Sequence, residues 1–269
     1  MTGFVLLILG IFFAVNLFFS SIIVILYPLF FDAPVDFMEL IEQSILVIYI
    51  LTSLFSLLLF WIVFLVMRKS WVRFSQFRKT QSNHLWYSVL MGLGFFMFFT
   101  GLLDLTGLPE HFPYYQEMME MITRQPFLLS LLTIGVVAPF FEEIMCRGII
   151  LNRIRQDLPV AAAILLQALL FGIIHFNWLQ GGYAFVGGIF MGLVFLWTGS
   201  LWVPVTIHLV WNISSVLVSH LGPAVDQFLL AAFLVVGILL LIPSIILFKN
   251  TRVASKEPPG SAMDQEPIV

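Results

Sequence analysis

Long runs of apolar residues fill most of the chain, and short polar stretches separate them. A transmembrane helix needs about 20 mostly apolar residues to cross a hydrocarbon core about 30 Å thick, and most of the runs reach or approach that length. The pattern therefore predicts an all-α, polytopic membrane protein with about eight transmembrane helices. The runs cover approximately residues 4–31, 43–67, 86–107, 126–150, 159–177, 182–198, 201–220 and 225–248.

The composition agrees with this reading of the pattern. Of the 269 residues, 61% are hydrophobic and only 10% are charged, whereas an average soluble domain is about 25% charged. One cysteine, Cys146, excludes an intrachain disulfide, and we expect it to be a small packing residue. The net charge of −3 gives no reason to expect a nucleic-acid partner.

The basic residues indicate the orientation of the chain. If both termini are cytoplasmic, ten of the twelve Lys and Arg residues fall on the cytoplasmic side, Arg124 lies opposite and Arg147 lies within a span. Such a bias follows the positive-inside rule, so we expect a multi-pass protein of the cell membrane with both termini in the cytoplasm. The ten residues are Arg68, Lys69, Arg73, Arg78, Lys79, Arg153, Arg155, Lys249, Arg252 and Lys256.

Several ionisable residues lie inside the apolar runs, where a central charge costs roughly 2.5–3.5 kcal/mol on insertion scales. Glu143 and Arg147 are four residues apart, so they share one helix face and are predicted to form a structural ion pair. Glu142 is rotated by about 100° from Glu143 around the helix. It is therefore free to face another part of the bundle.

Two further runs carry histidines at helical spacing. Phe171 and His175 are four residues apart, and so are His208 and Asn212, which places each pair on one face of its helix. Histidines in two spans, with paired glutamates in a third, predict a joint site in a cavity within the membrane. Glu142 is the side chain that this arrangement leaves without a basic partner.

This set of residues suits the hydrolysis of an amide. Glu142 and His175 would hold and deprotonate a water molecule, while His208 and Asn212 would donate hydrogen bonds to the tetrahedral oxyanion. Two histidines and a carboxylate are also a common catalytic zinc set, which here would be Glu142, His175 and His208. The residues alone leave both mechanisms open.

The motifs Glu142-Glu143-x-x-x-Arg147, Phe171-x-x-x-His175 and His208-x-x-x-Asn212 resemble those of the CPBP family. This group of CAAX proteases and bacteriocin-processing membrane proteins, also called the Abi family, is related to the type II CAAX prenyl endopeptidases. The resemblance covers about residues 125–220. It implies an eight-helix fold with an intramembrane cavity, and cleavage of a peptide near the membrane.

Carried over by motif position, the resemblance assigns water activation to Glu142 and His175 and the oxyanion hole to His208 and Asn212. It favours a metal-free glutamate mechanism with no required cofactor, a peptide or protein substrate at the lipid bilayer, and accessory roles for Glu143, Arg147 and Phe171. The alternative within the same family is a non-catalytic membrane regulator or an immunity protein. The predicted division is 1–124 for helices 1–3 and their loops, 125–250 for the CPBP-like catalytic core, and 251–269 for a disordered cytoplasmic tail.

Overall fold

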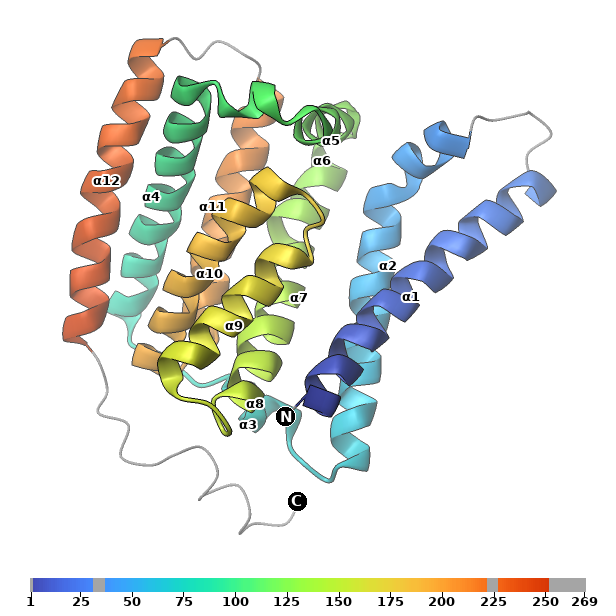
Figure 1. The fold of residues 1–269 in the computed structure, drawn as a ribbon, viewed down its shortest axis with the longest axis horizontal. Coiled ribbons are helices and arrows are strands. Elements are labelled where there is room, and N and C mark those ends of the chain that lie inside the picture. Colours follow the sequence, from blue (N-terminus) through green and yellow to red (C-terminus); the bar gives the residue numbers. More distant parts are fainter. Residues whose placement is uncertain (1, 31–36, 222–226, 252–269) are drawn as a thin grey trace.

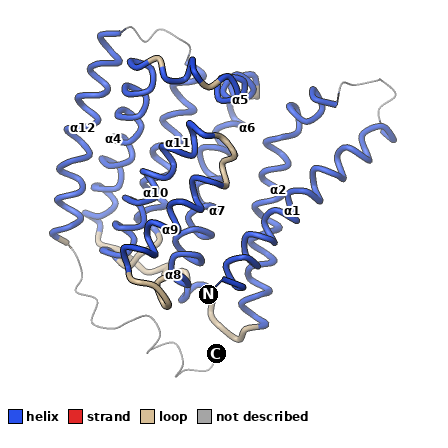
Figure 2. Tube along the Cα trace, in the orientation of Figure 1, coloured by secondary structure: helices blue, strands red, loops and turns tan. Residues whose placement is uncertain are grey.

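The computed structural model describes residues 2–30, 37–221 and 227–251. These residues are helical throughout, apart from short connections, and none of them forms a strand (Figure 2). The predicted disordered tail lies outside the described residues from position 252 onward. The helices are α1 Thr2–Phe30, α2 Phe37–Val66, α3 Trp71–Phe74, α4 Ser82–Thr106, η1 Leu108–His111, α5 Pro113–Arg124, α6 Phe127–Ser130, η2 Leu131–Val137, α7 Ala138–Glu143, η3 Ile144–Leu151, α8 Asn152–Ile154, α9 Val160–Ile173, α10 Trp178–Thr198, α11 Trp202–Leu221 and α12 Gln227–Asn250.

Seven helices within the described residues are long and apolar enough to cross a membrane. The predicted run 159–177, which would make the eighth span, forms α9. This helix is apolar but has only 14 residues. The fold class is therefore confirmed, and the chain is an integral multi-pass membrane protein. The orientation of its termini stays a prediction.

The fourth span is one continuous helix, from Phe127 to Ile154, but its hydrogen-bond pattern changes along its length. The α-helical segment α7 is flanked by two π-helical segments, η2 and η3. In a π-helix each N–H bonds five residues back rather than four. The residues on either side of α7 therefore do not follow the 3.6-residue spacing of the sequence analysis.

The long helices from α4 onward pack beside this span in a bundle (Figure 1). Helix α4 lies against α11 and α12, and α9 lies against α10. The contact of α4 with α12 is close, because a Cβ added at Gly237 would lie 2.5 Å from the backbone nitrogen of Phe98. Between α4 and α11, the rings of Phe99 and Trp211 stack with centroids 5.3 Å apart.

Helices α1 and α2 form a hairpin beside the bundle and diverge from it toward the Phe30 end (Figure 1). Phe12 of α1 and Phe60 of α2 both pack on Phe141, with ring centroids at 5.4 Å and 6.2 Å. Phe141 directly precedes Glu142, so this contact places the hairpin against the part of α7 that carries the paired glutamates.

Particular residues explain where α10 begins and where it ends. Asn177 is the N-cap, and its Oδ1 accepts a hydrogen bond from the backbone N–H of Gln180 at 3.0 Å. Gly199 ends the helix in the left-handed conformation, with φ of 63°, which glycine adopts without steric penalty. The run expected to be helical to residue 177 ends instead at Ile173, because the chain turns before Asn177 with φ of 50° at Phe176.

Candidate functional site

The first part of the site is a fully buried ion pair. Arg147 Nη1 donates to Glu143 Oε1 at 2.7 Å, and both side chains have no exposed surface. The guanidinium carbon of Arg147 lies 4.2 Å from the centre of the Phe171 ring, which adds a cation–π contact. The three accessory residues of the sequence analysis are therefore in direct contact, and Phe171 brings α9 to this pair.

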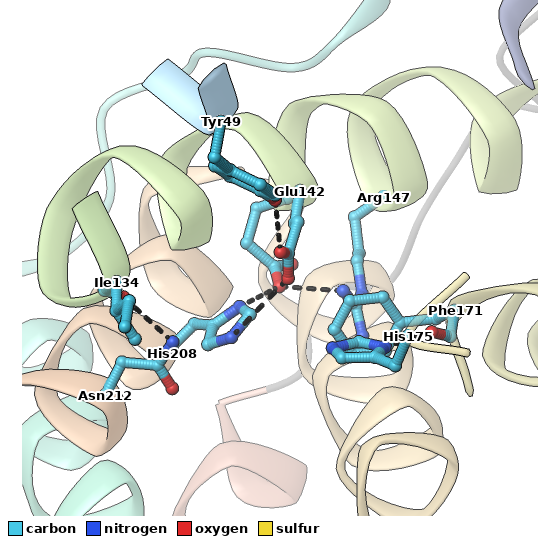
Figure 3. A network of polar contacts seen from close by, with 9 residues as sticks. Tyr49, Ile134, Glu142, Arg147, Phe171, His175, His208 and Asn212 are labelled. Atoms are coloured by element: carbon cyan, nitrogen blue, oxygen red, sulfur yellow. Dashed lines mark hydrogen bonds and ion pairs between the residues drawn. The ribbon is translucent and has the colours of Figure 1, made fainter. Parts of the chain in front are cut away.

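His208 on α11 lies between the two glutamates. Its Nδ1 lies 2.8 Å from Glu143 Oε1, and its Nε2 lies 3.9 Å from Glu142 Oε2 (Figure 3). An ionised carboxylate only accepts hydrogen bonds, so Glu143 holds the proton on Nδ1 and fixes the ring. Nε2 is thereby directed at Glu142.

Glu142 has a second partner that the sequence analysis did not find. The hydroxyl of Tyr49 on α2 donates to Glu142 Oε1 at 2.7 Å (Figure 3). Oε1 is thus engaged by the hairpin, while Oε2 faces His208. The Glu142 side chain keeps 12% of its surface exposed, in contrast to Glu143, and so remains accessible.

His175 lies in the turn after α9. Its Nδ1 lies 2.7 Å from the carbonyl oxygen of Phe171, and its ring meets the Phe171 ring edge to face at 5.0 Å. Because a carbonyl only accepts, Nδ1 donates this bond and Nε2 keeps its lone pair. No hydrogen bond or ion pair among the described residues joins His175 to Glu142 (Figure 3).

Asn212 lies one turn after His208 on α11. Its Nδ2 donates to the carbonyl oxygen of Ile134 at 3.0 Å (Figure 3). Ile134 belongs to the π-helical segment η2, whose altered bonding pattern places this carbonyl beside α11. An amide nitrogen has two N–H groups, so Asn212 retains one donor beyond this contact.

The structure therefore brings Glu142, Glu143, Arg147 and His208 into one contact network and adds Tyr49. His175 reaches the network through Phe171, whose ring centre also lies 5.9 Å from that of His208. Within the network, Arg147 balances the charge of Glu143. Neutrality of this kind lowers the free energy of burying the groups away from water.

The zinc alternative involves the same side chains. Within the described residues, no group of three His, Cys, Asp or Glu side chains is arranged to hold a metal ion. His208 Nδ1 is taken by Glu143 and His175 Nδ1 by a backbone carbonyl. These bonds leave Nε2 of both histidines available, as in many histidine-bound zinc sites, so the zinc set of Glu142, His175 and His208 stays an alternative.

The fold and these contacts define a polytopic membrane protein with an ionisable site inside its helical bundle. Residues 124–214 match a family model described as type II CAAX prenyl endopeptidase Rce1-like, which confirms the CPBP and CAAX protease resemblance of the three motifs. The matched family is a peptidase family, and the match contains every site residue named above except Tyr49. Comparison with curated proteins and with solved structures gives no match.

Proposed function

We propose that this protein is an intramembrane endopeptidase that cleaves a peptide or a membrane-associated protein with a water molecule activated by Glu142 and His175. The observation that carries the proposal is the approach of His208 Nε2 to Glu142 Oε2, at 3.9 Å, inside a segment that matches a peptidase family. Polar groups at such a separation are commonly bridged by water. Glu142, the carboxylate that would activate the water, therefore lies beside His208, which would donate a hydrogen bond to the oxyanion that the attack forms.

The reaction proceeds by general base catalysis. Glu142 takes a proton from the water, which is also hydrogen-bonded to the free Nε2 of His175, and the oxygen attacks the peptide carbonyl carbon. The negative charge moves to the carbonyl oxygen, where His208 Nε2–H and the second N–H of Asn212 donate to it. Glu142 then returns the proton to the leaving amine as the C–N bond breaks.

Three side chains hold these groups in place. Tyr49 binds Glu142 Oε1, which leaves Oε2 to act as the base. Glu143 fixes the Nδ1 proton of His208 and stabilises its charged form, while Arg147 balances Glu143. Fixed dipoles and charges of this kind require no reorganisation during the reaction. No metal or other cofactor is needed in this mechanism.

The proposed setting is the cell membrane, with both termini in the cytoplasm. The bias of basic residues toward one set of connections supports this orientation. The partners are then the lipid bilayer and a peptide or protein substrate at the membrane, and no nucleic acid is involved.

The decisive experiment compares new protein amino termini, identified by mass spectrometry, in cells producing the wild-type chain or Glu142→Gln. We expect termini that depend on the wild-type chain to vanish in Glu142→Gln and in His175→Ala, with insertion into the membrane unchanged. Glu120→Gln is the control, because Glu120 is an exposed carboxylate paired with Arg124 on α5. Identical termini from the wild type and Glu142→Gln would refute the mechanism.

A further inference from the structure

Two arginines lie near each other at the end of the bundle where α3 and α8 meet (Figure 1). Arg155 directly follows α8 and the fourth span, and Arg78 lies in the connection between α3 and α4. Burial and the neighbouring charge of Arg78 lower the pKa of Arg155 to about 10. The two guanidinium groups therefore repel one another, because each positive charge disfavours the charged form of the other.

Neither guanidinium group has an acceptor on the protein. Within the described part of the chain, neither side chain forms a hydrogen bond or an ion pair. Arg155 is partly buried, with its Nε enclosed and its two Nη atoms accessible. By contrast, Arg153, two residues earlier, bonds to Asp157 at 2.7 Å. A partly desolvated charge without a counter-charge is unfavourable, so an anion that reaches the Nη atoms would stabilise this end of the bundle.

The segment that carries Arg78 is fixed by hydrogen bonds to two other parts of the fold. The side-chain Nε2 of Gln76 donates to Asn152 Oδ1 at 3.1 Å, and the carbonyl oxygen of Arg78 accepts from the Ser200 hydroxyl at 2.6 Å. Gln76 has a φ of 57°, a left-handed conformation that is uncommon outside glycine and is often found at ligand-binding positions. Asn152 lies three residues before Arg155, so one frame positions both arginines.

This pair of arginines lies at the level where lipid headgroups begin. Arg155 is the first residue after the span Phe127–Ile154. Phe77, which directly precedes Arg78, meets the ring of Trp202 edge to face at 5.5 Å, and Trp202 is 43% exposed. Tryptophans are enriched where a membrane meets water. Phospholipid phosphates are therefore the anions closest to the two guanidinium groups.

We propose that Arg78 and Arg155 form a binding site for a phosphate group, which the headgroup of an anionic phospholipid supplies. Both guanidinium groups donate to the phosphate oxygens in the planar, forked geometry that suits arginine and phosphate. Basic pockets between transmembrane helices recognise anionic headgroups in this way. The inference goes beyond the proposed peptidase function, because a bound headgroup would hold the end of the span that carries Glu142 at the membrane surface.

The first arm of the test measures lipid binding without catalysis. The full-length protein, in dodecyl maltoside micelles free of lipid and phosphate, is titrated with dioleoylphosphatidylglycerol or dioleoylphosphatidylcholine and followed by native mass spectrometry. We expect the wild type to bind the anionic phosphatidylglycerol more tightly. Arg78→Gln and Arg155→Gln should each weaken that binding about tenfold, because each removes charge-assisted hydrogen bonds.

The matched control for this arm is Arg153→Gln. It removes the same charge two residues from Arg155, but from a side chain that already has Asp157 as its partner. Phosphatidylglycerol binding should therefore be unchanged in Arg153→Gln. Equal weakening in all three variants would show a general attraction to basic residues and would overturn the site, as would unchanged binding in both Arg78→Gln and Arg155→Gln.

The second arm measures thermal unfolding in the same micelles. Without lipid, Arg155→Gln should raise the unfolding midpoint, because it removes an unbalanced charge. With phosphatidylglycerol the order should reverse, because only the wild type gains stability from binding. A lower midpoint for Arg155→Gln under both conditions would show a purely structural role and overturn the proposal. Arg78 is exposed, so Arg78→Gln should fold and gives the same test if Arg155→Gln does not.

The third arm separates a lipid headgroup from soluble phosphate. Sodium phosphate is added to the lipid-free micelles, with sodium chloride at equal ionic strength as the control. Stabilisation of the wild type by phosphatidylglycerol, with or without a weaker effect of phosphate, would support the headgroup site. Stabilisation by phosphate alone, lost in both arginine variants, would support a phosphate site but overturn the lipid as its source. No difference between wild type and variants with either probe would overturn the site.

Discussion

The buried ion pair yields the sharpest prediction on stability. Replacing Arg147 with Met keeps the volume and the apolar contact with Phe171 but leaves Glu143 as an unbalanced buried charge. Both partners are fully buried, and the bond between them is 2.7 Å long. Removing one member of such a pair costs about 3–5 kcal/mol. We therefore expect Arg147→Met to lose that much free energy of unfolding.

The measurement is reversible unfolding in mixed micelles of increasing SDS fraction, followed by tryptophan fluorescence. The control is Arg124→Met, because Arg124 and Glu120 form a pair of the same spacing, each with 68% of its side chain exposed. Exposed pairs contribute about 0.2–1 kcal/mol. The two substitutions thus change the same residue types at opposite extremes of burial.

A double-mutant cycle isolates the interaction itself. Glu143→Gln combined with Arg147→Met removes both charges, so the double variant should be more stable than the sum of the single losses predicts by about 2 kcal/mol. The reasoning is wrong if the cycle shows no coupling, or if Arg147→Met is no more destabilised than Arg124→Met.

Four further outcomes follow from the site and the packing. Tyr49→Phe should lower kcat about tenfold with little change in KM, because it removes a hydrogen bond to a charged base; a change in KM alone would exclude a positioning role. Asn212→Ala should lower kcat/KM, because roughly 3–4 kcal/mol of transition-state stabilisation is lost. A wild-type rate in this variant would show that Asn212 is not part of the oxyanion hole. Element analysis of active protein should find substoichiometric zinc, and the chelator phenanthroline should not inhibit cleavage. Cleavage that a chelator abolishes would instead support the zinc mechanism. Gly237→Ala should lower the thermal unfolding midpoint through overpacking of about 1–3 kcal/mol, since its Cβ would meet the Phe98 nitrogen at 2.5 Å.

Much of the fold follows from hydropathy, because the bilayer imposes helix length and internal hydrogen bonding. The apolar runs predicted the long helices within a few residues. They did not reveal α5, from Pro113 to Arg124, because its twelve residues are too few and too polar to span. The sequence also did not predict the π-helical segments around α7, because no residue type in Leu131–Val137 marks a change in backbone hydrogen bonding.

The site was predicted in part for an equally physical reason. Charged residues in apolar runs stand out, so Glu142, Glu143 and the two histidines could be found by position alone. Tyr49 could not, because an aromatic residue is ordinary in a membrane helix and its partner is 93 residues away. The contact of His208 with Glu143 was also unforeseen, because spacing along one helix carries no information on side chains from another.

The location of Glu143 and Arg147 on one helix also matters for biogenesis. A span enters the bilayer before its neighbours have packed around it, and each unpaired central charge opposes that step by roughly 2.5–3.5 kcal/mol. These two residues are four apart on a single span and bond directly, so they neutralise each other during insertion without waiting for another helix. Glu142 has its partners on α2 and α11 instead, so its site is complete only when both of those helices have packed against the span.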